Sequence, residues 1–188
     1  MSLMRLIRRA SPIERTGSPI RLNLGCGNMR LDGWVNIDIN PQVKPDICCD
    51  LLSVRHHFQP SSVDEILLIH SISYLRLWEA RIFFKNALAM LKPGGRFVLE
   101  FPDAAKCAKH LLENEGERDE YIEAIRGFYA FDLQQIKNKE QYQPYSFGWS
   151  ARHISDELKT IGFREVISGD PQTHGPRLWR DSRIVATK

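Results

Sequence analysis

A glycine-bearing turn between two short apolar runs constrains this chain more than any other feature. The first run covers residues 20–24, the turn contains Gly25 and Gly27, and the second run, residues 34–39, contains Asp38. If the two runs are neighbouring parallel strands, the turn and the acid meet at the same edge of a sheet. Glycine lets a ligand lie close to the backbone, and a carboxylate at the next strand end can accept two hydrogen bonds from a ribose diol. The feature therefore predicts a site for a nucleoside-containing cofactor.

Strand-like and helix-like segments alternate along the rest of the chain. Expected strands cover residues 20–24, 34–39, 46–49, 63–69, 96–101, 163–168 and 184–187, and expected helices cover 77–91, 104–112, 121–131 and 151–161. Such alternation is typical of an α/β protein whose parallel strands are joined through helices. We therefore expect a doubly wound, mostly parallel sheet of about seven strands, with a shortened first helix and an antiparallel closing strand.

Length and composition predict one globular domain. The chain has 188 residues, of which 43% are hydrophobic and 26% are charged. We expect residues 1–19 to form a flexible basic tail and residues 20–188 to form a single domain, with a substrate-side insertion around 113–149. No apolar run reaches transmembrane length and the N-terminus lacks the apolar core of a signal peptide. These features predict a cytoplasmic protein without a membrane span, as a monomer or homodimer.

Charge and metal-ligand patterns exclude two classes of function. The net charge is only +3 and the Lys and Arg residues are scattered, whereas a nucleic-acid surface needs a clustered basic stripe. The four cysteines form no CxxC pair, and His56 and His57 have no third ligand nearby in the sequence. We therefore expect no nucleic-acid partner and no metal site, and a small molecule as the substrate.

The spacing of the opening feature decides between cofactors. A dinucleotide site needs G-x-G-x-x-G at the start of a helix and an acid about 20 residues on. Here Arg30 occupies the third glycine position and Asp38 follows Gly25 by 13 residues, which is too short for a full connecting helix. Without that helix a pyrophosphate has no dipole to bind, and no G-K-[ST] of a Walker A loop is present. The interval favours S-adenosylmethionine, which carries a ribose and an adenine but no phosphate.

Four stretches then resemble a class I S-adenosylmethionine-dependent methyltransferase. They are LNLGCG at 22–27, GWVNID at 33–38, VDEI at 63–66 and LKPGGR at 91–96. Their compact spacing is most similar to a subgroup of predicted methyltransferases of the type 11-like kind, some of them associated with sugar or cell-surface polysaccharide pathways. The resemblance covers residues 20–103 well and implies a Rossmann-like methyltransferase fold. It also implies a small or medium polar acceptor, such as a sugar or polysaccharide precursor.

The resemblance also implies roles for individual residues. Cofactor contacts are expected from Asn23, Leu24, Gly25, Cys26, Gly27, Asp38, Ile39, Asp50, Leu51 and His70. Asp38 would take the ribose hydroxyls, Asp50 the adenine amino group, and His70 would lie near the methionyl part. The chain departs from the family twice, because Asn23 replaces a common acid and H-S-I-S-Y at 70–74 replaces the frequent H-x-L-E-H.

The substrate side is less defined by the sequence. Asp103, Tyr145 and Trp149 are candidate substrate-binding residues, although Asp103 also suits a helix N-cap and the aromatic residues also suit a core or lid. No spacing singles out a general base, so the catalytic residue stays unknown. Two other functions remain open: a non-catalytic cofactor-binding or partner subunit on the same fold, and a nicotinamide-nucleotide enzyme.

Overall fold

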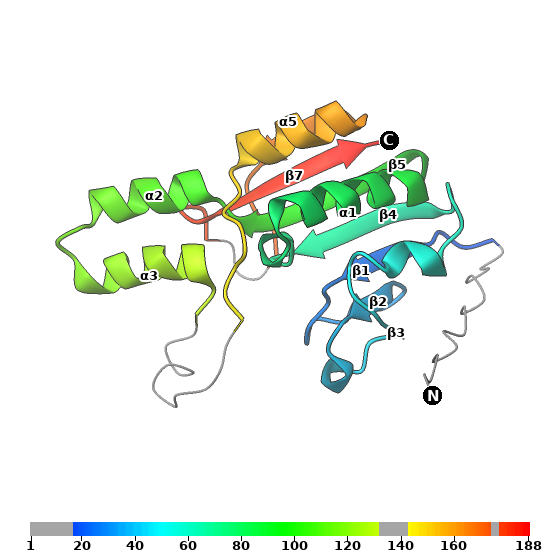
Figure 1. Ribbon diagram of the computed structural model, residues 1–188, viewed down its shortest axis with the longest axis horizontal. Coiled ribbons are helices and arrows are strands. Elements are labelled where there is room, and N and C mark those ends of the chain that lie inside the picture. Colours follow the sequence, from blue (N-terminus) through cyan, green and yellow to red (C-terminus); the bar gives the residue numbers. More distant parts are fainter. Residues whose placement is uncertain (1–16, 132–142, 174–176) are drawn as a thin grey trace, which may run out of the picture.

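The computed structural model contains one seven-stranded sheet, and it describes residues 17–131, 143–173 and 177–188 (Figure 1). The strands are β1 Arg21–Leu24, β2 Val35–Asp38, β3 Ile47–Cys48, β4 Val63–Ile69, β5 Leu91–Pro102, β6 Arg164–Gly169 and β7 Asp181–Thr187. Their order is β3-β2-β1-β4-β5-β7-β6, and only β7 runs antiparallel to its neighbours. The predicted mostly parallel sheet with an antiparallel closing strand is confirmed.

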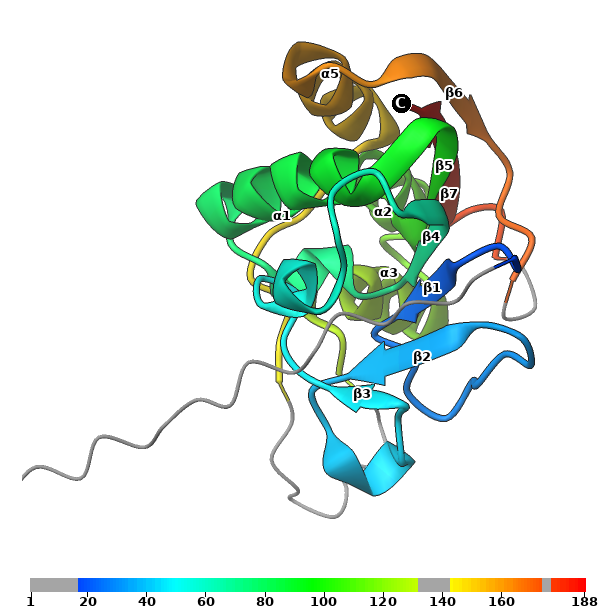
Figure 2. The ribbon, with the colours of Figure 1, turned by 90° about the vertical axis from the view of Figure 1, so that its right-hand side faces the viewer.

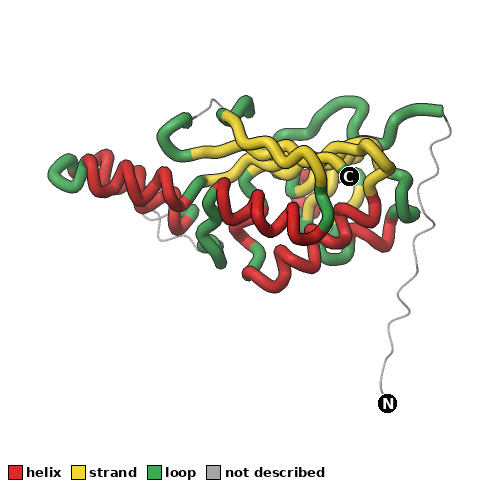
Figure 3. Tube along the Cα trace, turned by 90° about the horizontal axis from the view of Figure 1, so that it is seen from above, coloured by secondary structure: helices red, strands yellow, loops and turns green. Residues whose placement is uncertain are grey.

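The helices lie on one face of this sheet and at its carboxyl edge. They are α1 Leu77–Met90, α2 Ala104–Glu113, α3 Arg118–Tyr129 and α5 Ala151–Ile161, with short 3-10 turns η1 Pro41–Val43, η2 Val54–His57 and η3 Ile72–Tyr74. Among the described residues, the helices all lie on the same side of the strands in Figure 3, and loops run over the opposite face. The α2 and α3 helices project beyond the carboxyl end of β4 (Figure 1).

The connection between β1 and β2 contains no helix. Residues 25–34 form turns only, although we expected a shortened helix in the first crossover. Gly25, Gly27 and Gly33 all have positive φ angles in this segment, a backbone conformation that glycine adopts without a steric penalty. The short sequence interval thus leads to a loop, and no helix N-terminus points at the carboxyl edge of β1.

An aromatic core joins the sheet to its helices. The ring of Phe97 on β5 packs edge-on against Phe83 and Phe84 of α1. Its centroid lies 5.6 Å from that of Phe163, and the Trp149 ring packs against Phe84. All five rings are 4% exposed or less. Burial of aromatic side chains of this size is a dominant contribution to the stability of a domain.

Most element boundaries match the sequence prediction to within a few residues. The Ser150 hydroxyl caps α5, and Gly162 ends that helix with a φ of +117°, as expected. Two boundaries differ: β5 begins at Leu91, five residues before the expected strand, and α3 begins at Arg118, three residues before the expected helix. Most of the expected N-terminal tail and part of the expected insertion around 113–149 lie outside the described residues.

Candidate functional site

A cavity of about 500 Å³ opens at the carboxyl edge of the sheet, where β1, β2 and β4 end. Its lining combines seven of the residues expected at the cofactor site, namely Gly25, Gly27, Asp38, Ile39, Asp50, Leu51 and His70. A second cavity of about 280 Å³ shares Gly25, Gly27 and His70 with the first and adds Asn23 and Cys26. In an open α/β sheet, ligands bind in the crevice at this edge, beside the point where the strand order reverses. Here that point lies between β1 and β4.

The glycine turn and the acid are directly connected. The Gly27 amide donates a hydrogen bond of 2.8 Å to Oδ2 of Asp38, and the Asn40 amide donates one of 2.8 Å to Oδ1. At Gly25, an added Cβ would overlap Ser71, whereas at Gly27 it would meet nothing within 4 Å. The backbone at Gly27 therefore faces open space in the cavity, so that a ligand can approach it closely.

A network of side-chain hydrogen bonds holds the loop that replaces the first helix. Nδ2 of Asn23 donates to Oδ1 of Asn36 at 2.9 Å and to the carbonyl of Met29 at 2.8 Å. The backbone amide of Asn36 in turn donates a hydrogen bond to the Asp46 carboxylate. The same carboxylate accepts a bond of 2.6 Å from the Arg30 guanidinium. A carboxylate at position 23 would repel Oδ1 of Asn36, which explains why the acid common in the resembling family is replaced by an amide here.

Asp50 lines the cavity and also caps the following turn. Its Oδ1 accepts hydrogen bonds from the amides of Leu52 and Ser53, and its Oδ2 accepts one from the Ser53 hydroxyl. Burial raises the pKa of Asp50, but these hydrogen bonds outweigh burial and lower it below its ordinary value. Because a carboxylate has about four acceptor sites, an ionised Asp50 retains one for a ligand.

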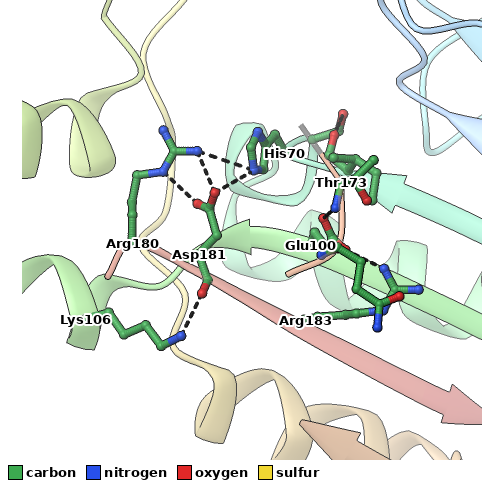
Figure 4. A network of polar contacts seen from close by, with 10 residues as sticks. His70, Glu100, Lys106, Thr173, Arg180, Asp181 and Arg183 are labelled. Carbon is green, nitrogen blue, oxygen red and sulfur yellow. Dashed lines mark hydrogen bonds and ion pairs between the residues drawn. The ribbon is translucent and has the colours of Figure 1, made fainter. Parts of the chain in front are cut away.

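His70 connects the cavity to a charged cluster at the start of β7 (Figure 4). Its Nε2 lies 3.3 Å from Oδ2 of Asp181, and the Arg180 guanidinium binds both carboxylate oxygens of Asp181 at 2.7 Å. Lys106 donates a hydrogen bond to the carbonyl of Asp181. Burial raises the pKa of Asp181, but the hydrogen bonds from His70 and Arg180 outweigh it and lower the pKa to about 2.

Two tyrosines form a pair at the larger cavity. Tyr74 lines the larger cavity, and its ring packs edge-on against Tyr145 with centroids 5.0 Å apart. Burial raises the pKa of the Tyr145 phenol well above its ordinary value, and the nearby Tyr74 adds to this rise. Both phenols are therefore neutral hydrogen-bonding groups at physiological pH.

No protein-family model and no curated protein sequence matches this chain. Solved structures do match. A methyltransferase from Archaeoglobus fulgidus, described as dependent on S-adenosylmethionine, superposes with a TM-score of 0.62, over 92% of this chain and 87% of its own, at 15% identity. The fold is that of an S-adenosylmethionine-dependent methyltransferase.

Two further matches agree with this fold. A methyltransferase from Methanosarcina mazei, also described as S-adenosylmethionine-dependent, has a TM-score of 0.60 at 16% identity, covering 89% of this chain and 91% of its own. The N-methyltransferase NodS from Bradyrhizobium japonicum was solved with S-adenosyl-L-homocysteine. It has a TM-score of 0.57 at 16% identity, covering 90% of this chain and 78% of its own. The methyltransferase fold thus extends over nearly the whole chain, including the part after residue 103.

Two of the three predicted substrate residues are structural parts of this methyltransferase fold. Trp149 is completely buried, and its Nε1 has no hydrogen-bond partner among the described residues, so its ring is part of the core. Asp103 is 4% exposed, and its carboxylate accepts bonds from the amides of Ala105 and Ala151 and from the Ser182 hydroxyl. It caps two helices, which is the second of the two roles expected for it from the sequence.

Leu24 is completely buried in the core and its side chain lines neither cavity. Sequence reasoning missed Arg180 and Asp181, because they follow His70 by more than a hundred residues and form no motif with it.

Among the described residues, no group of three or more His, Cys, Asp and Glu side chains could hold a metal ion. Within the same part of the chain, no helix is both long enough and apolar enough to cross a membrane.

Proposed function

We propose that this protein is an S-adenosylmethionine-dependent methyltransferase acting on a small or medium polar molecule. The observation that carries the proposal is the charge of the larger cavity. Asp38 and Asp50 line it, and no Lys or Arg occurs among its described lining residues. Two carboxylates attract the positively charged sulfonium of S-adenosylmethionine and repel a pyrophosphate.

The absence of a helix between β1 and β2 supports the same ligand. Pyrophosphates in doubly wound folds bind at the N-terminus of the first crossover helix, where free amides and the helix dipole meet the charge. Residues 25–34 contain turns only, so the Gly25–Gly27 edge has no such dipole. A nucleoside without phosphates does not need one.

Different residues of the cavity would bind different parts of the cofactor. Asp38 would accept the ribose hydroxyls, since its two oxygens are held in place by the amides of Gly27 and Asn40. Asp50 and Leu51 would border the adenine, and His70 would border the methionyl end where the two cavities meet. When bound, S-adenosylmethionine supplies an electrophilic methyl group, and the protein contributes binding and orientation.

The acceptor side favours a polar molecule with an extended face, such as a sugar or polysaccharide precursor. Tyr74 and Tyr145 offer aromatic faces and neutral hydroxyls beside His70. The α3 helix, which belongs to the expected substrate-side insertion, projects together with α2 from the same edge of the sheet (Figure 1). Amphipathic rings of this kind combine apolar contact with a polar tip.

Titration calorimetry with three ligands tests the cofactor. We expect S-adenosylhomocysteine to bind with micromolar affinity, and NAD and ATP not to bind at the same concentrations. Binding of NAD or ATP without S-adenosylhomocysteine would overturn the proposal. Transfer of a labelled methyl group from S-adenosylmethionine to a panel of monosaccharides and nucleotide sugars then tests the acceptor.

A further inference from the structure

We propose that Thr173 binds the amino-acid end of S-adenosylmethionine and that Glu100 positions it. This inference rests on the proposed methyltransferase function and deepens it, because it adds a residue from the C-terminal part of the chain to the cofactor site. Thr173 lies in the connection between β6 and β7, and it lines the smaller cavity together with the glycine turn. Figure 2 shows the described part of this connection on the face of the sheet opposite α1.

The smaller cavity suits the amino-acid end of the cofactor. It shares Gly25, Gly27 and His70 with the larger cavity, whereas Asp38 and Asp50, the proposed partners of the ribose and the adenine, line the larger cavity alone. A nucleoside bound to these two acids would therefore extend its methionyl chain across the shared residues into the smaller cavity. That end carries a carboxylate and an ammonium, and both need hydrogen-bonding partners when they leave water.

The described lining of the smaller cavity offers neutral polar groups for these charges. Asn23, Asn28 and Thr173 line it, and no Asp, Glu, Lys or Arg is among its described lining residues. A threonine hydroxyl both donates and accepts hydrogen bonds, so it can bind a carboxylate or an ammonium. The two asparagines flank the glycine turn, so Thr173 adds a polar group from a different part of the sheet.

A buried glutamate fixes the backbone at Thr173. The side chain of Glu100 on β5 is 1% exposed, and Arg183 of β7 pairs with its carboxylate. The same carboxylate accepts hydrogen bonds of 2.8 Å from the Gln172 amide and 3.0 Å from the Thr173 amide (Figure 4). Burial raises the pKa of Glu100, but the hydrogen bonds from Gln172, Thr173 and Arg183 outweigh burial and lower the pKa below its ordinary value. The carboxylate is therefore ionised at physiological pH and holds two successive backbone amides.

The place of Glu100 in the sheet argues for a role beyond stability. A buried ion pair contributes little net stability compared with apolar residues of similar size, because both charges lose their hydration. The Glu100 carbonyl also accepts a hydrogen bond of 2.7 Å from the His70 amide, so one residue holds both the end of β4 and the connection after β6. Both segments line the smaller cavity. Orientation of these two walls gives the buried charge a function.

Titration calorimetry with two ligands tests the contact. S-adenosylhomocysteine carries the amino-acid end, whereas methylthioadenosine has the same nucleoside and a thioether but lacks that end. Thr173→Val keeps the backbone amide and the side-chain shape but loses the hydroxyl. We expect this variant to bind S-adenosylhomocysteine about tenfold more weakly than wild type and methylthioadenosine within about twofold of wild type.

Thr160→Val is the matched control, because Thr160 lies on α5 and lines neither cavity. It should change the affinity for neither ligand. If Thr173→Val binds S-adenosylhomocysteine as tightly as wild type, or weakens both ligands equally, the contact with the amino-acid end is overturned.

A double-mutant cycle tests the positioning role of Glu100. Glu100→Gln replaces one acceptor oxygen by an amide group that cannot accept, so one of the two backbone hydrogen bonds is lost. We expect it to weaken S-adenosylhomocysteine about tenfold and methylthioadenosine by less than about twofold. Combined with Thr173→Val, it should bind S-adenosylhomocysteine within about twofold of the weaker single variant, because both changes remove one interaction. Losses that multiply overturn the positioning role.

Glu100→Asp decides the same question if Glu100→Gln does not fold. It keeps the charge that pairs with Arg183 but withdraws it from the two amides, so the same loss for S-adenosylhomocysteine alone is expected. Failure of the wild-type protein to bind either ligand overturns the proposed function and this inference with it. Binding of both ligands by wild type, with a Thr173→Val variant that does not discriminate between them, overturns this inference alone.

Discussion

The backbone amide of Gly27 donates a hydrogen bond of 2.8 Å to the carboxylate of Asp38, so the glycine turn and the strand-end acid form one unit. Each holds the other in the position where a ribose would bind. The carboxylate also accepts a bond from the Asn40 amide, which leaves further acceptor sites directed at a ligand.

Replacing Asp38 by Ala should therefore weaken binding of S-adenosylhomocysteine by about 10- to 100-fold. The estimate follows from hydrogen bonds to a charged group, which contribute about 1.5–3 kcal/mol. Titration calorimetry measures the change. Asp32→Ala is the matched control, because Asp32 is an exposed acid of the same connection and lines neither cavity. Equal affinity of both variants would exclude Asp38 from the cofactor site.

The two glycines of the turn should respond differently to alanine. At Gly25 the φ angle is +61° and a new Cβ would lie 2.8 Å from the Ser71 Cβ, whereas at Gly27 nothing lies within 4 Å. We expect Gly27→Ala to lower the free energy of unfolding by about 1–2 kcal/mol through the backbone alone, and Gly25→Ala to lower it further. Urea denaturation compares them. Adding Ser71→Gly should partly restore the free energy of unfolding that Gly25→Ala loses. If it restores none, the loss does not come from a clash between the new Cβ and the Ser71 side chain.

Loss of the Asp103 carboxylate should destabilise the fold without changing the affinity for S-adenosylhomocysteine. Asp103→Ala removes caps from α2 and α5 together, each contributing about 0.5–2 kcal/mol, so we expect a loss of about 1–4 kcal/mol. Ser150→Ala removes only the other cap of α5 and is the control. Urea denaturation gives the stabilities and calorimetry the affinity for S-adenosylhomocysteine. A large loss of affinity at unchanged stability would restore a ligand-binding role.

The low pKa of Asp181 predicts a loss of stability in acid. A carboxyl group with a pKa of about 2 in the folded state, against an ordinary value of 3.8, stabilises the protein above pH 3.8. This contribution disappears as the pH falls from 4 towards 2 and amounts to about 2 kcal/mol between pH 5 and pH 2. Urea denaturation at both values measures it. Asp181→Asn lacks the titrating group, so the stability difference between wild type and variant should shrink by this amount at pH 2.

Local sequence patterns predict many of the residues that line the larger cavity, because the contacts among them are short in sequence. Gly27 and Asp38 are only 11 residues apart, and parallel pairing of β1 with β2 brings them together without help from the rest of the chain. The same interval is too short for a full connecting helix, and the shortened helix that we expected in its place is absent as well.

The substrate side depends on contacts that no local pattern encodes. His70 meets Asp181 only because the antiparallel strand β7 starts where β4 ends, and these two strands are separated by β5. The burial of Trp149 and the capping role of Asp103 could not be predicted for a related reason. In a sequence, an aromatic residue or an acid that follows a strand suits either a binding surface or a structural role. The structural role becomes visible only in the fold, where Trp149 packs against Phe84 and the Asp103 carboxylate accepts a hydrogen bond from the first amide of α5.

The segment that carries α2 and α3 leaves the sheet and returns to it at one point. Asp103 pairs with Trp149 as an isolated bridge, and the Ala104 amide donates a hydrogen bond of 2.7 Å to the Trp149 carbonyl. The ends of this excursion are thus joined whatever its contents, and lengthening a closed loop costs only about 0.6 kcal/mol for each doubling. Replacing the interior of the excursion should therefore leave the pairing of β1 with β2 intact, and would change only those cavity contacts that the excursion itself supplies, such as Gln143.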